Sequence, residues 1–77
     1  MNTYYNFSIR INQAIKEASN AIGYEQVAKS IRKIERAYET YLNDCDVMNE
    51  VEYGKARYKF LGTLDWMRQR YDQLRYN

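Results

Sequence analysis

Histidine and proline are absent from this 77-residue chain, which has one cysteine and three glycines. The absence of histidine removes the commonest general base and metal ligand. Cys45 belongs to an apolar helical stripe, where a buried structural thiol is a better interpretation than a nucleophile. The glycines, at positions 23, 54 and 62, are too far apart to form a phosphate-binding loop. The sequence therefore predicts no enzyme, no cofactor and no metal site.

Long apolar runs are also missing. No segment approaches the roughly 20 apolar residues that a membrane-spanning helix needs. Residues 1–23 lack the unbroken apolar core of a secretory signal. A single cysteine cannot form an internal disulfide, which fits a reducing compartment. We therefore expect a soluble, cytoplasmic protein that does not bind membranes. Its size and character also suggest a phage or mobile-element origin, which would place it in the host cytoplasm.

The chain has no strong excess of either charge, because 12 basic residues face 10 acidic ones and leave a net charge of +2. A dedicated nucleic-acid-binding domain is usually more basic. Aromatic residues are abundant instead: nine tyrosines, two phenylalanines and one tryptophan. Tyrosine combines an apolar ring with a polar hydroxyl, so it suits half-hydrated surfaces and protein interfaces.

The first residues carry two conflicting patterns. From Tyr5 to Asn12, apolar and polar residues alternate, which is typical of a half-buried strand. A helical spacing of apolar residues runs through the same segment, at Tyr4, Phe7, Ile11, Ala14, Ala18 and Ile22. A strand at residues 3–11 would have to pair with another subunit or another protein, because the rest of the chain offers no second strand. We predict a helix over residues 8–22, and a short strand before it stays an alternative.

A long helix is predicted over residues 24–45. Its apolar residues follow a heptad spacing for more than three repeats, with no glycine or proline inside: Tyr24, Val27, Ile31, Ile34, Tyr38, Tyr41, Cys45 and Met48. Gly23 separates this helix from the one before it. Five tyrosines lie on the predicted core stripes, so we expect a core that is shallow and hydrated at its rim.

A third helix is predicted over residues 49–75. Asn49 and Glu52 have the spacing of a capping box. The acidic side chains around this start lack the pattern of a calcium-binding loop, and turn and cap chemistry account for them. The core stripe of the third helix contains Tyr53, Ala56, Phe60, Leu64, Met67, Tyr71 and Leu74. The short connection makes the second and third helices antiparallel neighbours. The predicted fold is all-α: a long antiparallel hairpin crossed or capped by the shorter first helix, in one domain spanning residues 1–77.

One candidate surface lies on the third helix, away from its core stripe. It combines two aromatic residues with basic and polar ones: Lys55, Tyr58, Lys59, Trp66 and Gln69. Aromatic residues mixed with cations, beside Gly62, are typical of the centre of a protein interface. Two alternatives stay open: the first helix or a second subunit covers these aromatics as part of the core, or they stack on exposed nucleic-acid bases.

A second candidate surface lies on the second helix, opposite its heptad stripe. Lys29, Arg32, Lys33 and Arg36 occur at i, i+3, i+4 and i+7 and share one helical face. Four cations on one face can follow a row of phosphates. An ordinary solvated face is the simpler interpretation, because glutamates border the stripe.

The sequence thus predicts a small non-enzymatic interaction module that binds another protein through the aromatic and basic face of its third helix. Such a module would act as an accessory regulator, an adaptor or a stoichiometric inhibitor, and we expect it to form a homodimer. The alternative is a small nucleic-acid-binding regulator that uses Lys29, Arg32, Lys33 and Arg36. A purely structural oligomerisation element is a third hypothesis.

Overall fold

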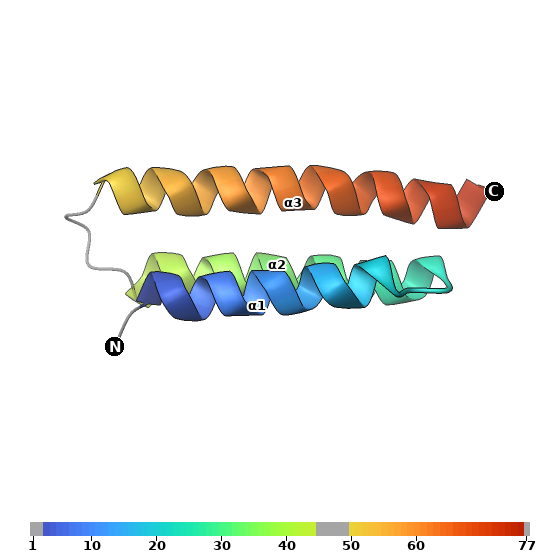
Figure 1. The fold of residues 1–77 in the computed structure, drawn as a ribbon, viewed down its shortest axis with the longest axis horizontal. Helices are drawn as coiled ribbons and strands as arrows, with labels where there is room; N and C mark the ends of the chain where they lie inside the picture. Colours follow the sequence, from blue (N-terminus) through green and yellow to red (C-terminus); the bar gives the residue numbers. More distant parts are fainter. Residues whose placement is uncertain (1–2, 45–49, 77) are drawn as a thin grey trace.

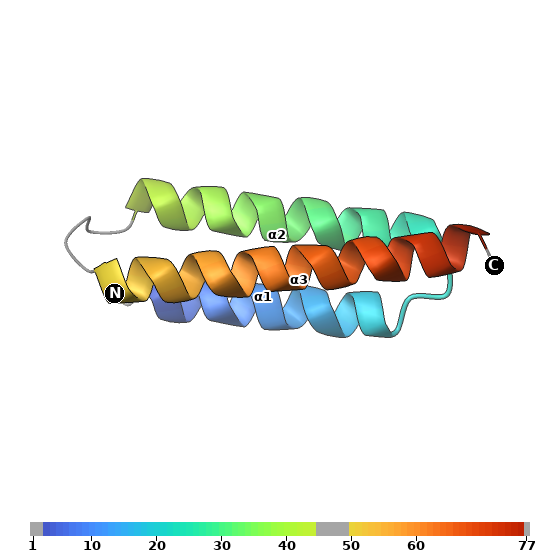
Figure 2. The ribbon, with the colours of Figure 1, turned by 90° about the horizontal axis from the view of Figure 1, so that it is seen from above.

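The computed structural model describes residues 3–44 and 50–76, which form three α-helices: α1 (Thr3–Ser19), α2 (Tyr24–Asp44) and α3 (Glu50–Tyr76). Successive helices are antiparallel: α1 and α3 run from left to right in Figure 1, and α2 runs in the opposite direction. Each helix contacts the other two. In Figure 2, which looks down on α3, this helix lies in front of the other two, with α2 on one side of it and α1 on the other. The all-α prediction is confirmed. The first helix, however, runs alongside the other two instead of crossing them, so the fold is an elongated three-helix bundle of 44 × 18 × 15 Å.

The amino-terminal segment is helical from Thr3, and the strand alternative for residues 3–11 is wrong. Helix α1 begins five residues before the predicted residue 8 and ends three before residue 22. The helical spacing prevails because it buries Phe7, Ile11, Ala14 and Ala18 on one side of α1. A strand at this position would leave its backbone groups without a partner, since the described residues contain no other strand.

An arginine from α3 caps the end of α1. Arg70 Nε donates a hydrogen bond to the Ala18 carbonyl (3.3 Å), and Arg70 Nη2 donates to the carbonyls of Ser19 (3.4 Å) and Ala21 (3.2 Å). The last carbonyls of a helix have no helical N–H to accept from, and a cation there also favours the helix dipole. The chain then turns, and Ile22 is 90% exposed. Ile22, the last residue of the helical apolar spacing, therefore lies outside α1 and does not pack against the core.

Helix α2 begins at the predicted residue, Tyr24. Gln26 Oε1 accepts hydrogen bonds from the backbone N–H groups of Ile22 (2.7 Å) and Gly23 (3.3 Å). This is half of a capping box, in which the third helical residue reaches back to satisfy free N–H groups. A local side chain therefore caps the start of α2, whereas a distant arginine caps the end of α1.

The buried side of α2 is turned slightly from the predicted stripe. Val27, Ile34 and Tyr41 are buried as predicted, and the small residues Ser30 and Ala37 are buried beside them. The predicted stripe residues Ile31 and Tyr38 are partly buried against the core, and Tyr24 is 38% exposed. One helix must face two neighbours, so its apolar side is wider than a two-helix seam. The predictions for Cys45 and for a helix start at Asn49 lie outside the described residues.

Helix α3 contributes a narrower buried stripe to the core. Ala56, Leu64 and Met67 are buried, and Phe60, Tyr71 and Leu74 pack partly against the core, as the heptad pattern predicts. Tyr53 is 43% exposed, so its assignment to the core is wrong. It lies in the first turn of α3, which extends beyond the ends of α1 and α2 in both views (Figures 1 and 2).

An aromatic cluster fills the end of the bundle near Thr3. It joins all three helices through Tyr4, Phe7, Tyr38, Tyr41 and Phe60. The rings of Tyr38 and Phe60 stack with centroids 4.3 Å apart, and those of Phe7 and Tyr41 are 5.2 Å apart. The Tyr41 hydroxyl donates to Glu52 Oε1 over 3.3 Å, so this tyrosine is only 2% exposed yet satisfied. The expectation of a hydrated rim does not hold for Tyr41.

A second aromatic cluster closes the opposite end. The rings of Tyr24 and Tyr71 meet edge to face with centroids 5.4 Å apart, and the Arg75 guanidinium lies 5.5 Å from the Tyr24 centroid. Arg75 Nη1 donates a hydrogen bond to the Tyr71 hydroxyl over 2.6 Å, and this contact raises the pKa of Arg75 above its ordinary value. The cluster ties the start of α2 to the end of α3.

Candidate interaction surfaces

One side of α3 points away from both other helices. We call the outer face of α3 the stripe formed by Val51, Lys55, Tyr58, Gly62, Asp65, Gln69, Asp72 and Tyr76, all of which are exposed. Asp72, at the edge of the stripe, also lines a hollow between α2 and α3. Three of the five predicted partner-binding residues, Lys55, Tyr58 and Gln69, belong to this stripe. They span about 21 Å of helix at 1.5 Å per residue. The structure therefore brings them together on one continuous surface.

The other two predicted residues, Lys59 and Trp66, lie at the edge of this face. Trp66 is 38% exposed and Lys59 is half-buried. Trp66 precedes Arg70 by one helical turn, and Arg70 contacts the end of α1, so this edge is the one nearer α1. Trp66 is therefore partly committed to the bundle, whereas Tyr58, at 83% exposed, belongs to the surface alone.

Apolar side chains on this side of α3 are more numerous than the sequence-based site indicates. Val51 is 70% exposed, Leu61 49% and Tyr76 73%. Val51 and Leu61 are absent from the predicted site, although they lie seven residues before and three residues after Tyr58, spacings that place residues on one side of a helix. Large apolar side chains that stay exposed along one side of a helix favour its interpretation as a contact surface.

The polar residues of the outer face make few contacts within the chain. Gln69 Nε2 donates to Asp65 Oδ2 over 3.1 Å. Lys55 and Asp72 form no ion pair within residues 3–44 and 50–76, where the one ion pair joins Lys33 to Glu17. An ideal Cβ built on Gly62 meets no atom within 4 Å. The outer face is thus open, and nothing in the described fold occupies the space above Gly62.

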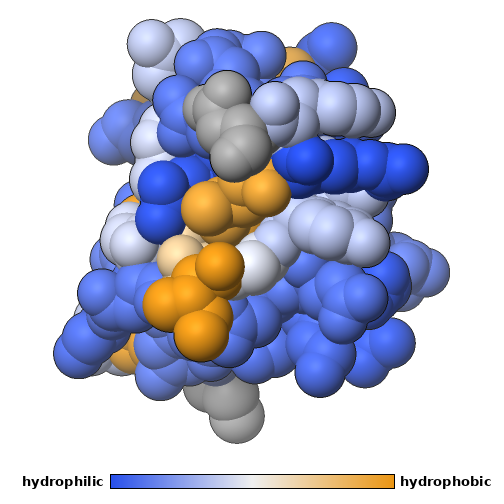
Figure 3. Space-filling model, turned by 90° about the vertical axis from the view of Figure 1, so that its right-hand side faces the viewer, coloured by the Kyte–Doolittle hydropathy of each residue, from blue (hydrophilic) through white to orange (hydrophobic). Residues whose placement is uncertain are grey.

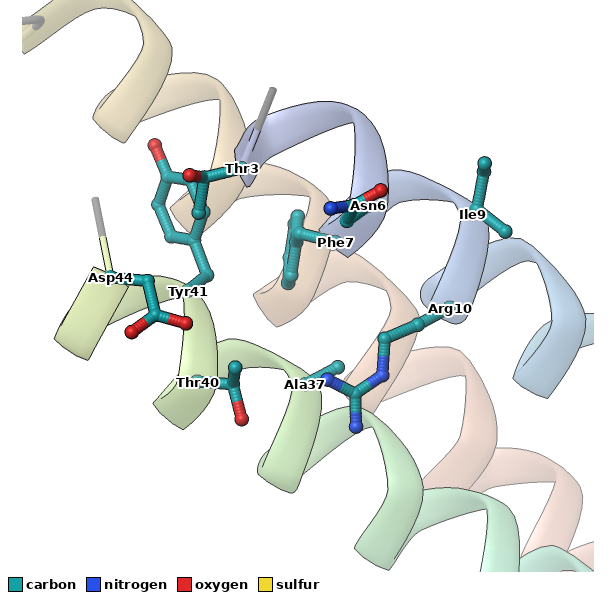
Figure 4. A pocket seen from close by; sticks show the side chains of 9 residues that line it. All are labelled: Thr3, Asn6, Phe7, Ile9, Arg10, Ala37, Thr40, Tyr41 and Asp44. Atoms are coloured by element: carbon teal, nitrogen blue, oxygen red, sulfur yellow. The ribbon is translucent and has the colours of Figure 1, made fainter. Parts of the chain in front are cut away.

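A groove runs between α1 and α2 on another side of the bundle. It consists of three shallow hollows that share lining residues, and the largest, about 570 Å³, lies near the start of α1. Figure 4 shows this hollow, with Phe7, Ala37 and Tyr41 at its base and Arg10 extending from α1 towards α2. We call this feature the α1–α2 groove.

Basic side chains from two helices line the α1–α2 groove. Lys29, Lys33 and Arg36, three of the four predicted nucleic-acid-binding residues, lie along it. The fourth, Arg32, lines a different hollow between α2 and α3, together with Glu35, Arg68 and Asp72. The structure therefore divides the predicted basic stripe between two surfaces.

Helix α1 adds two cations that the sequence-based site missed, Arg10 and Lys16. They were missed because they lie on a different helix, and only the packing of α1 against α2 brings them beside Lys29 and Arg36. Glu17 partly offsets the charge, since its Oε2 is 2.6 Å from Lys33 Nζ. Both partners of this ion pair are at least half exposed, so it contributes little to stability.

The end of the bundle that carries the α1–α2 turn has a small apolar area surrounded by polar side chains (Figure 3). Ile22 is the most exposed large apolar residue of the described chain and lies in this turn. A single exposed isoleucine is common on protein surfaces and indicates no site by itself.

Comparison with protein-family models, with curated proteins and with solved structures finds no match for this chain. Within the described residues, no helix has the length and apolar character needed to cross a membrane, and no three potential metal ligands gather together. The candidate sites are therefore the outer face of α3 and the α1–α2 groove.

Proposed function

We propose that this chain is a small non-enzymatic interaction module, acting as an accessory regulator, adaptor or stoichiometric inhibitor, and that the outer face of α3 binds its protein partner. The main support for this proposal is that α3 exposes large apolar side chains away from the core, at Val51, Tyr58, Leu61 and Tyr76. Exposed aromatics next to cations give most of the free energy of binding in many protein interfaces.

Tyr58 is the sharpest probe of this proposal because its ring is exposed and serves no packing role in the described fold. Immobilised protein should retain a partner from cell extract, and Tyr58→Ala should lose it while keeping the same helical content. Tyr5→Ala is the matched control, since Tyr5 is an exposed tyrosine on α1. A partner that all three proteins retain equally would refute the proposal.

Trp66 supplies a direct optical readout, since it is the single tryptophan of the chain. Its emission should shift to shorter wavelength when the captured partner covers it. Trp66→Ala should weaken binding by about 2 kcal/mol or more while the helical content stays unchanged. Loss of folding in this variant would instead assign Trp66 to the core.

A second candidate function is nucleic-acid binding by the α1–α2 groove. The supporting observation is that Arg10 and Lys16 extend the basic stripe of α2 into a surface made by two helices. Cations that neutralise phosphates release counterions, so affinity should fall steeply with salt. With about four phosphates neutralised, the log–log slope should be about −4.

This candidate is tested by titrating labelled duplex DNA at several salt concentrations. The double variant Lys29→Glu and Arg36→Glu should abolish binding and leaves the Lys33–Glu17 ion pair in place. The matched control, Lys55→Glu and Lys59→Glu, makes the same charge change on α3 and should leave binding unchanged. Equal losses in the two double variants would show that only the net charge matters.

A further inference from the structure

The outer face of α3 has a heptad spacing of its own. Its eight exposed residues are separated by 4, 3, 4, 3, 4, 3 and 4 positions from Val51 to Tyr76. This spacing keeps them in one stripe that a second helix can follow, in the manner of a coiled coil. The stripe extends over nearly all of α3, whose 27 residues span about 40 Å.

Gly62 lies at the middle of this stripe and has no role in the described fold. Glycine inside a helix costs about 1 kcal/mol relative to alanine. It is not required by backbone conformation, since no described residue has a positive φ, and an added Cβ would meet nothing within 4 Å. The absence of a side chain does, however, let the backbone of another helix approach closely.

Charges along the stripe have a polarity. Lys55 lies in its first half, whereas Asp65 and Asp72 lie in its second half. A parallel copy of α3 would place each of these residues in the same layer as its own like charge, which is unfavourable. An antiparallel copy would place Lys55 opposite Asp72 of the partner subunit, and would do so twice because of the two-fold symmetry.

We propose that the partner of the outer face is a second copy of this chain, packed antiparallel along α3 about a two-fold axis between residues 63 and 64. This inference rests on the proposed function of that face. In this arrangement Val51 meets Tyr76 of the partner subunit, Tyr58 meets Gln69 of the partner subunit, and Gly62 lies over Asp65 of the partner subunit. At the edge, Lys59 reaches the ring of Trp66 of the partner subunit, a favourable cation–π geometry.

Like charges at the edges of the stripe select this register. A shift of one heptad in one direction places Lys59 opposite Lys59 of the partner subunit. A shift in the other direction places Arg68 opposite Arg68 of the partner subunit. The proposed register has neither clash and matches the stripe over its full length, so the absence of repulsion and the longer overlap favour it.

The test is sedimentation equilibrium over a range of protein concentrations, together with Trp66 emission on dilution. The wild-type chain should be a dimer whose Trp66 emission moves to longer wavelength as it dissociates. Lys55→Asp should weaken the dimer at least about tenfold, because it creates two like-charge contacts. Adding Asp72→Lys should restore the affinity to within about threefold of wild type by exchanging the partners of the pair.

Two matched variants guard the register and the fold. Arg57→Asp makes the same charge change on α3 outside the stripe and should leave the dimer intact. Lys55→Asp with Asp65→Lys should stay dissociated, because residue 65 does not face residue 55 in the proposed register. All variants should keep the helical content of the wild-type chain.

A wild-type chain that stays monomeric at every concentration, or rescue by Asp65→Lys instead of Asp72→Lys, would overturn the proposal. If the wild-type chain is monomeric but retains a partner from extract, and Tyr58→Ala abolishes that retention, the self-association proposal is refuted and the proposed function stands. A dimer that is unaffected by both Lys55→Asp and Tyr58→Ala, with no extracted partner dependent on Tyr58, would overturn both.

Discussion

Helices α2 and α3 are both long members of one bundle, but they distribute their apolar side chains differently. In α2 the large apolar residues gather on the side that faces the other helices, and the remaining surface is mainly charged. In α3 they lie on both sides, with Leu64 and Met67 buried and Tyr58 and Tyr76 exposed. The bundle therefore buries most of the large apolar side chains of α2, although Tyr24 and Leu42 are 38% and 39% exposed. On the outer face of α3, Val51 and Tyr58 stay uncovered in the described fold, and the ring of Tyr76 contacts the Arg75 guanidinium.

Large apolar residues have two roles here, packing the core and forming an exposed surface, and composition alone does not distinguish them. Side chains of α2 pack the core, and those of α3 both pack the core and form a surface. A helix that is apolar on opposite sides is stable in water only when something covers both sides, or when its exposed side includes polar groups. The outer face of α3 has such groups in Lys55, Gln69 and Asp72.

The largest change in the free energy of unfolding is expected for a buried residue of α2. Ile34→Ala should lower the free energy of unfolding by about 3 kcal/mol, because Ile34 is fully buried and its truncation leaves a cavity. Val51→Ala on the outer face should change it by less than about 0.5 kcal/mol. Denaturant unfolding at a concentration where the chain is monomeric measures both. Equal losses would mean that the outer face of α3 is part of the core.

An effect of intermediate size is expected for Arg70, the residue through which the inner side of α3 stabilises the end of α1. Arg70→Ala should lower the free energy of unfolding by about 1–2 kcal/mol, because the carbonyls of Ser19 and Ala21 lose the Arg70 donor and the Ala18 carbonyl keeps only its bond from the Ala21 N–H. Amide hydrogen exchange in the last turn of α1 should accelerate. Arg70→Lys should recover only part of the loss, since lysine lacks the planar fork, and Arg57→Ala should change neither quantity.

The smallest expected effect has the opposite sign. Gly54→Ala and Gly62→Ala should each raise the free energy of unfolding of the monomer by about 0.5–1 kcal/mol, because the added methyl group meets nothing and alanine favours the helix. Only Gly62→Ala should also weaken self-association, since Gly62 lies at the centre of the proposed interface. Thermal unfolding and sedimentation measure the two effects separately. A destabilised Gly62→Ala monomer would contradict the open surface seen above this residue.

Much of the fold followed from local sequence. The heptad spacing of α2 and α3 predicted both helices and most of their buried residues, such as Val27, Ile34 and Met67. The start of α2 at Tyr24 was predicted from Gly23 and is fixed by Gln26, only three residues away. Such features are accessible because helix periodicity and capping involve residues within about four positions of each other.

The residues that share a candidate surface were predicted from the sequence only where a single helix supplies all of them. The outer face of α3 is such a case, and Lys55, Tyr58 and Gln69 are exposed on one stripe as the spacing indicated. The basic surface is not, because α1 supplies Arg10 and Lys16 while Arg32 faces another hollow. A surface shared between helices depends on their relative rotation, which the periodicity of each helix leaves undetermined.

The spacing of residues along single helices was enough to establish that this chain is helical, where α2 begins, and which side of each long helix is buried. Packing between helices was needed to make residues 3–11 helix and not strand, since both patterns were present and only the burial of Phe7 and Ile11 against the core distinguishes them. Packing also supplies the cap at the end of α1, because Arg70 donates to carbonyls that lie 49 to 52 positions away in the sequence. Contacts between residues so far apart exist only after the helices have packed.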